Sequence, residues 1–100
     1  MDKLISHYRQ LLQEASSQIK VRGEALATAE KEYRTALADK LMFLREQKVQ
    51  ATLMDNLAKG DKAIAELRHA RDIANARYKS NIAAVDVYIT IINSYNLIDN

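Results

Sequence analysis

No proline occurs anywhere in this chain of 100 residues, and only two of its residues are glycine. Average usage would supply about five prolines and seven glycines in a chain of that length. So few turn-forming residues argue against sandwiches and barrels, which connect many short strands. Cysteine is also absent, which excludes a disulfide scaffold and cysteine-based zinc, iron–sulfur or thiol chemistry. The composition therefore predicts an all-α protein, with residues 1–100 forming a single helical domain.

The charge balance narrows the class of partner. The chain has fifteen Lys and Arg residues and thirteen Asp and Glu residues, so its formal net charge is only +2. This near balance argues against a dedicated nucleic-acid binder and against an acidic mimic of DNA. The first residues, from Met1 to Arg9, lack the long apolar core of a signal peptide. The longest uncharged run, over residues 87–98, is too short to span a membrane. We expect a cytoplasmic protein without membrane contact, and the lack of cysteine fits that expectation.

The first half of the chain carries one helical pattern, over about residues 3–48. Its apolar positions recur with an 11-residue period, which corresponds to three turns of a nearly straight helix. The stripe includes Leu4, Tyr8, Leu11, Ala15, Ile19, Leu26, Tyr33, Leu37, Leu41 and Leu44. Gly23 lies inside this pattern. It is either a tolerated glycine, at a cost of about 1 kcal/mol, or a mark of a kink or a close helix–helix approach.

The middle of the chain predicts a short helix and a turn. Thr52 and Asp55 have the spacing of a capping box, which would start a helix over about residues 53–59. Gly60 fits a left-handed helix C-cap, where glycine is the favoured residue. Asp61 fits the N-cap of the next helix. We therefore expect the one sharp turn of the chain at residues 59–61, with Gly60 and Asp61 as its structural residues.

The last helix is predicted over about residues 62–96. Its C-terminal part has isoleucine and valine on most sides of a helix, and residues 85–91 also alternate as a strand would. A lone strand has no partner here, so helix is favoured. A hairpin of two helices cannot cover this much apolar surface, which predicts a homodimeric four-helix bundle. The predicted interface comprises Ile82, Val85, Tyr88, Ile89, Ile92 and Tyr95.

Chemistry-bearing motifs are scarce. Glu66 and His69 have the Glu-x-x-His spacing of di-iron bundles, but they flank the apolar seam and do not lie on it, which favours a solvated helix face. The chain has no glycine-rich phosphate loop and no strand-to-helix elbow for a nucleophilic serine. We therefore predict no catalytic residue, no metal site and no cofactor.

A second function remains open, because basic side chains line one side of the last helix. Arg68, Arg71, Asn75 and Lys79 fall on one line and could contact phosphates. The simpler interpretation is a solvated face of mixed charge, since Asp72 lies four residues after Arg68. A nucleic-acid-binding accessory factor is thus the alternative to a protein-binding module.

Several segments resemble a known group of proteins. The segments are residues 52–61, Ala65 to Arg68, Arg71 to Asp72 and Tyr78 to Ser80. Over about residues 33–95 the chain is similar to small helical proteins of unknown function from phages and prophages of Gram-positive bacteria. The resemblance carries no catalytic motif. It implies a phage-encoded protein in the host cytoplasm that binds or inhibits a host or phage protein, for example as an anti-defence inhibitor of a nuclease or a CRISPR effector.

Overall fold

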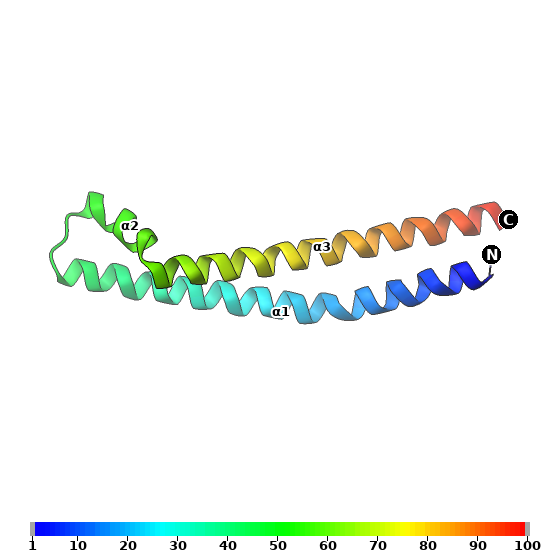
Figure 1. Cartoon of the computed structure of the whole chain (residues 1–100), viewed down its shortest axis with the longest axis horizontal. Coiled ribbons are helices and arrows are strands. Elements are labelled where there is room, and N and C mark those ends of the chain that lie inside the picture. The colour runs from blue at the N-terminus through cyan, green and yellow to red at the C-terminus, as the bar shows by residue number, and fades with distance from the viewer. Residues whose placement is uncertain (1, 100) are drawn as a thin grey trace. The chain divides into compact units, whose positions relative to one another are not determined.

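The computed structural model describes residues 2–99, with the side chains of residues 2–98. It contains three helices, α1 (Asp2–Glu46), α2 (Ala51–Gly60) and α3 (Lys62–Asp99) (Figure 1). The predicted all-α class and the order of a long, a short and a long helix are confirmed. Residues 85–91 lie within α3, so the strand alternative is wrong. None of the three helices has the length and apolar character needed to cross a membrane.

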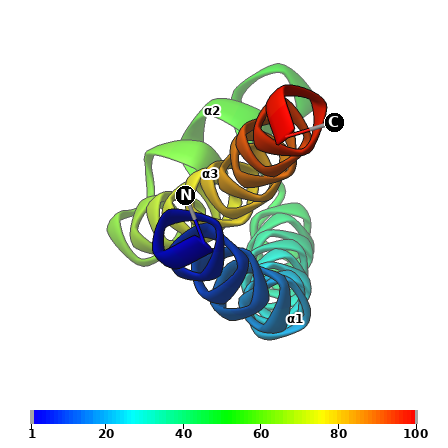
Figure 2. The same cartoon turned by 90° about the vertical axis from the view of Figure 1, so that its right-hand side faces the viewer.

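Contacts along the chain define two compact units. The first unit joins the start of α1, up to Glu24, to the end of α3, from Ala76 onward. The second unit, residues 25–75, holds the rest of α1, all of α2 and the start of α3. In the first unit the two helical stretches run antiparallel beside each other (Figures 1 and 2).

The chain reverses its direction between α1 and α2, at a motif centred on Lys48. The backbone N–H of Val49 donates to the Leu44 carbonyl at 3.1 Å, and that of Lys48 donates to the Arg45 carbonyl at 3.0 Å. These two bonds form a Schellman motif, in which the residue at the position of Lys48 must be left-handed. Lys48 has a φ of 61° accordingly. The sharp reversal therefore lies before α2 and not at residues 59–61, and the predicted place of the turn is wrong.

At the boundary between α2 and α3, the predicted glycine C-cap of α2 is absent, whereas the predicted N-cap of α3 is present. Gly60 is the last residue of α2, and no glycine within residues 2–99 has a positive φ, so the left-handed C-cap is wrong. An extended Asp61, with φ −64° and ψ 131°, separates the two helices instead. Its carboxylate accepts the backbone N–H of Ile64 at 3.2 Å. The predicted N-cap of α3 is thus confirmed.

The predicted capping box of α2 is also wrong. The helix begins at Ala51, and its N-cap residue, Gln50, makes no side-chain cap hydrogen bond. Asp55 pairs with Lys59 at 3.0 Å, one turn further along α2. The Asp55 carboxylate takes part in this i,i+4 ion pair and not in a cap. The spacing between Thr52 and Asp55 was therefore a misleading indication of a capping box.

The core is thin. The buried apolar side chains are Ile5, Tyr33, Leu44, Ala58, Ile64 and Ile92, and among the described residues no large side chain is less than 2% exposed. In the first unit the ring centroid of Tyr8 lies 6.3 Å from those of Tyr88 and Tyr95. Aromatic rings, rather than layers of leucine, therefore fill much of the seam in this unit.

Gly23 marks a close approach of the two helices within the first unit. A Cβ atom at this position would lie 3.4 Å from Cε2 of Tyr78. The Tyr78 ring therefore lies beside the α1 backbone at Gly23, at a distance that a Cβ atom would tolerate, so the glycine is tolerated here and not required.

Candidate interaction surfaces

The residues expected to form the dimer interface divide into two groups on α3. Ile92 is buried, and Val85, Tyr88 and Tyr95 are half-buried. The contacts of Tyr8 with two of these tyrosines place that group in the seam with α1. Ile82 and Ile89 remain 37% and 41% exposed. They lie seven residues apart, on one flank of the helix. Of the six predicted interface residues, this pair is the one that is exposed for contact with another molecule.

Other large apolar side chains of the first unit are also exposed to solvent. They are Leu4, Val21, Val87, Leu97 and Ile98. The whole chain exposes 7417 Å², whereas a folded monomer of 11.4 kDa exposes about 5,800 Å². The excess of about 1,600 Å² is roughly twice what one partner buries in a standard protein–protein interface. The first unit thus leaves a set of large apolar side chains in contact with solvent.

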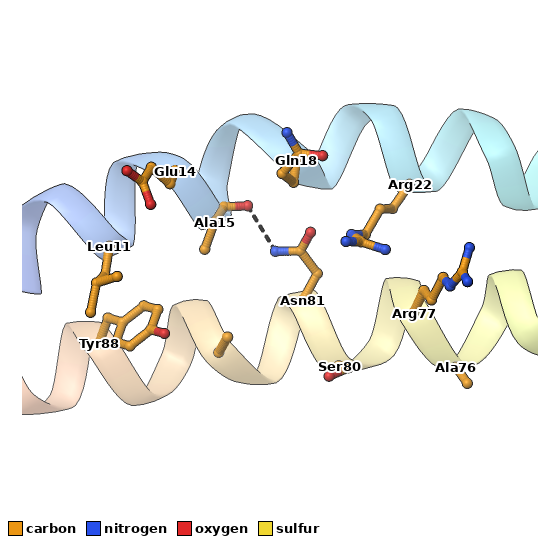
Figure 3. Close-up of a pocket in the computed structure, with 11 residues that line it drawn as sticks. Leu11, Glu14, Ala15, Gln18, Arg22, Ala76, Arg77, Ser80, Asn81 and Tyr88 are labelled. Carbon is orange, nitrogen blue, oxygen red and sulfur yellow. Dashed lines mark hydrogen bonds between the residues drawn. The ribbon is translucent and has the colours of Figure 1, made fainter.

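A groove of about 600 Å³ lies between α1 and α3 in the first unit (Figure 3). Its lining includes Leu11, Glu14, Ala15, Gln18, Arg22, Arg77, Asn81 and Tyr88. Ser80 and Ala84 also line the groove. With 3.6 residues per helical turn, they lie on the side of α3 opposite to Ile82 and Ile89. The first unit therefore has an apolar flank and, separately, a polar groove.

Asn81 is the buried polar side chain of this groove, with 9% of its surface exposed. Its Nδ2 donates to the Ala15 carbonyl at 2.8 Å and so ties α3 to α1. Its Oδ1 has no donor among the described residues. A buried acceptor without a donor costs about 1–3 kcal/mol. The sequence carried a signal for this site, because Asn81 interrupts the apolar seam of α3 between Tyr78 and Val85.

Two arginine side chains lie in the groove on one side of the Asn81 amide, with Arg22 the nearer of the two (Figure 3). Figure 3 shows Arg22 pointing from α1 toward α3 and Arg77 pointing from α3 toward α1. Within the described part of the chain, neither side chain makes an ion pair or a side-chain hydrogen bond. Glu14 is the acid of the lining, so the groove carries a positive excess. Its features suit a ligand that accepts hydrogen bonds and bears negative charge.

The basic residues predicted to contact nucleic acid are partly engaged within the second unit. Arg68 Nη1 donates to the Lys59 carbonyl at 3.4 Å. The Arg71 guanidinium lies 4.5 Å from the ring centroid of Tyr33 and pairs with Asp72 at 2.9 Å. Its hydrogen bond to Asp72 raises the pKa of Arg71 above its usual value. These two side chains are therefore committed to contacts inside the chain.

The other two residues of the predicted stripe have different surroundings. Asn75 is half-buried in the second unit, and Lys79 is exposed in the first unit. Glu66 and His69 are exposed on α3. Among the side chains of residues 2–98, no group of three or more potential metal ligands comes together.

At the start of α3, Asp61 joins two helices of the second unit by electrostatics. Its Oδ2 lies 3.3 Å from Nζ of Lys40, on α1. The backbone N–H of Ile64, and after it the Lys40 ammonium, hold the pKa of Asp61 below its ordinary value. This carboxylate therefore anchors the beginning of α3 to α1 within the second unit.

Comparison of the chain with protein-family models, with curated proteins and with solved structures finds no match. A function must therefore be argued from the surfaces of the molecule, namely the exposed Ile82 and Ile89 flank and the Arg22, Arg77 and Asn81 groove.

Proposed function

We propose that this chain is a non-enzymatic protein-interaction module that acts as a homodimer. The observation that supports this proposal is the set of large apolar side chains that the first unit leaves exposed, with Ile82 and Ile89 on one flank of α3 among them. Hydrophobic patches that remain exposed on a soluble chain mark interaction sites. Symmetric dimers are the commonest way in which one chain covers such a patch with its own copy.

The flank that holds Ile82 and Ile89 is the surface we assign to dimerisation. Both side chains belong to the first unit, and both are exposed although they are large and apolar. A two-fold axis beside α3 would place this flank against the same flank of a second copy. Two helical hairpins joined in this way form a four-helix bundle. Each isoleucine that becomes fully buried stabilises the assembly by roughly 1 kcal/mol, since about half of its surface is already covered.

Three matched variants of α3 test this proposal by sedimentation velocity and circular dichroism. Ile89→Asp is expected to halve the mass without loss of helix, because a carboxylate on the flank would be buried without a partner in the dimer. Ile92→Asp is expected to unfold the first unit, because Ile92 is buried within one chain. Thr90→Asp adds the same charge at an exposed position and should remain dimeric. A dimer that Ile89→Asp does not weaken would refute the assignment.

The protein that this dimer binds is proposed from the phage resemblance of residues 33–95. On that basis we propose a host or phage protein, with inhibition of a defence nuclease as the working example. Affinity capture from a host lysate with the parent chain and with Ile89→Asp would identify partners that require the dimer. Binding to nucleic acid is the weaker alternative, because Arg68 and Arg71 already contact other groups. Absence of DNA and RNA binding at about 50 mM salt would eliminate it.

A further inference from the structure

We infer that the groove between α1 and α3 of the first unit binds an acidic peptide segment of a partner protein. This inference rests on the proposed function, because it names the kind of segment that the interaction module recognises. The groove has a volume of about 600 Å³ and is separate from the flank that holds Ile82 and Ile89. It can therefore remain open when two copies associate through that flank.

Arg22 and Arg77 supply the charge that selects an acidic segment. They come from different helices, and both guanidinium groups lack an acidic partner within residues 2–98. Arg34 and Arg71 of the same two helices, in contrast, pair with carboxylates of the chain. A guanidinium group holds a carboxylate through two parallel N–H···O bonds. One acidic side chain in the groove would satisfy groups that the chain itself leaves free.

Asn81 supplies the feature that favours a peptide over a simple anion. Its Oδ1 is a buried acceptor without a donor among the described residues, and the Arg22 guanidinium lies beside it, with Arg77 farther along the groove (Figure 3). A phosphate or an isolated carboxylate is itself an acceptor and cannot satisfy another acceptor. A peptide segment carries both a carboxylate side chain and backbone N–H donors. A modest turn of the flexible Arg22 or Gln18 side chain would let such an N–H reach Oδ1.

The remaining lining residues favour a peptide over a nucleic acid. Because Glu14 offsets part of the charge of Arg22 and Arg77, the groove has only a small positive excess, which suits a single carboxylate better than the closely spaced phosphates of a nucleic acid strand. Leu11, Ala15, Ala84 and Tyr88 provide apolar surface for the side chains next to the acidic residue. The α3 flank of a second copy fits less well, because Asp86 is the one charged residue between Ser80 and Ile98.

Fluorescence anisotropy tests the inference with defined probes at about 50 mM salt. The probes are a labelled decapeptide of alternating Glu and Ala, the same peptide with Gln in place of Glu, inorganic phosphate as a competitor, and a single-stranded oligonucleotide. The Glu peptide is expected to bind at least tenfold more tightly than the Gln peptide, since each ion pair that the Gln peptide lacks weakens binding by about tenfold. Arg22→Gln and Arg77→Gln should each weaken binding of the Glu peptide by about tenfold.

Arg9→Gln is the matched control, because it removes the same charge from an exposed position on α1 in the first unit. Equal loss of affinity in Arg9→Gln and Arg22→Gln would overturn the inference, as would tighter binding of the oligonucleotide or displacement of the peptide by low phosphate. A fall in the dimer mass in Arg22→Gln would show that a second copy fills the groove, and would also overturn it. If a monomeric Ile89→Asp variant still binds the Glu peptide, the assignment of the groove as the peptide site is supported independently of the proposed homodimer.

Discussion

The Asn81 side-chain amide donates a hydrogen bond of 2.8 Å to the carbonyl of Ala15, and so joins residues 66 positions apart in the sequence. Most of the other side-chain hydrogen bonds of the described residues span four positions or fewer. Because apolar packing between two helices can slide by one turn, a single directional bond fixes the register of the first unit. This bond therefore aligns both the groove and the seam of tyrosines.

Replacing this amide by a carboxylate should weaken the fold. In Asn81→Asp the donor to the Ala15 carbonyl is lost, and a buried negative charge faces a carbonyl oxygen. We expect a loss of about 2–3 kcal/mol in the free energy of unfolding at pH 7. The loss should shrink in acid as the introduced carboxylate takes up a proton. Urea unfolding at pH 7 and pH 4 measures both effects. Asn93→Asp, at an exposed position on α3, should change stability by less than about 0.5 kcal/mol.

The contact of Gly23 with Tyr78 gives a size-dependent prediction. A methyl group fits at 3.4 Å from the Tyr78 ring, so Gly23→Ala should gain helix propensity without displacing the ring. We expect stabilisation by about 0.5–1 kcal/mol. Gly23→Leu should instead push Tyr78 out of the seam and destabilise the chain by about 1–3 kcal/mol. Thermal unfolding followed by circular dichroism checks the pair. Equal effects of the two substitutions would contradict the close approach.

Lys48 occupies a left-handed position that glycine fills at lower cost. Lys48→Gly should stabilise the chain by about 0.5–1 kcal/mol, because a side chain disfavours this conformation. Lys48→Val should have the opposite effect, since branching at Cβ makes a positive φ still less favourable. At Gly60 the φ is not positive and a Cβ would meet nothing within 4 Å, so Gly60→Ala should be stabilising as well. Urea midpoints of the three variants measure these differences.

Stability should depend on pH through Asp61. Its pKa in the folded state is lower than the ordinary value of about 3.9, because the Ile64 N–H and Lys40 favour the carboxylate. The stabilisation is therefore complete above the ordinary pKa and is lost as the pH falls through the lower, folded pKa. Asp61→Asn keeps a capping side chain but does not titrate, so its urea midpoint should fall less between pH 5 and pH 2. Asp39→Asn, at an exposed position on α1, should retain the acid dependence of the parent chain.

The helical class and the element order followed from the sequence because proline is absent and apolar residues recur with a helical period. The N-cap at Asp61 was also predictable, since a side-chain cap depends on only four consecutive residues. The sharp turn was predicted at Gly60 because glycine is the residue type most often found in the left-handed conformation. In the structure Lys48 has that conformation instead. Local preference is weak compared with the constraint that the packed helices impose on the loop.

The surfaces were less predictable than the helices. Periodicity placed Ile89 and Ile92 on one apolar segment, but it could not tell which of them faces α1. The groove at Asn81 depends on the register of two helices that are far apart in the sequence, and one helical pattern holds no information about that register. Asn81 itself was visible as a polar interruption of a seam, which is the kind of signal that marks a specific contact.

The mass of the unmodified chain at low micromolar concentration tests the central claim most directly. Light scattering coupled to size exclusion should give twice 11.4 kDa, because the first unit leaves large apolar side chains exposed, with Ile82 and Ile89 on one flank of α3 among them. A clean mass of 11.4 kDa across that concentration range would contradict the account.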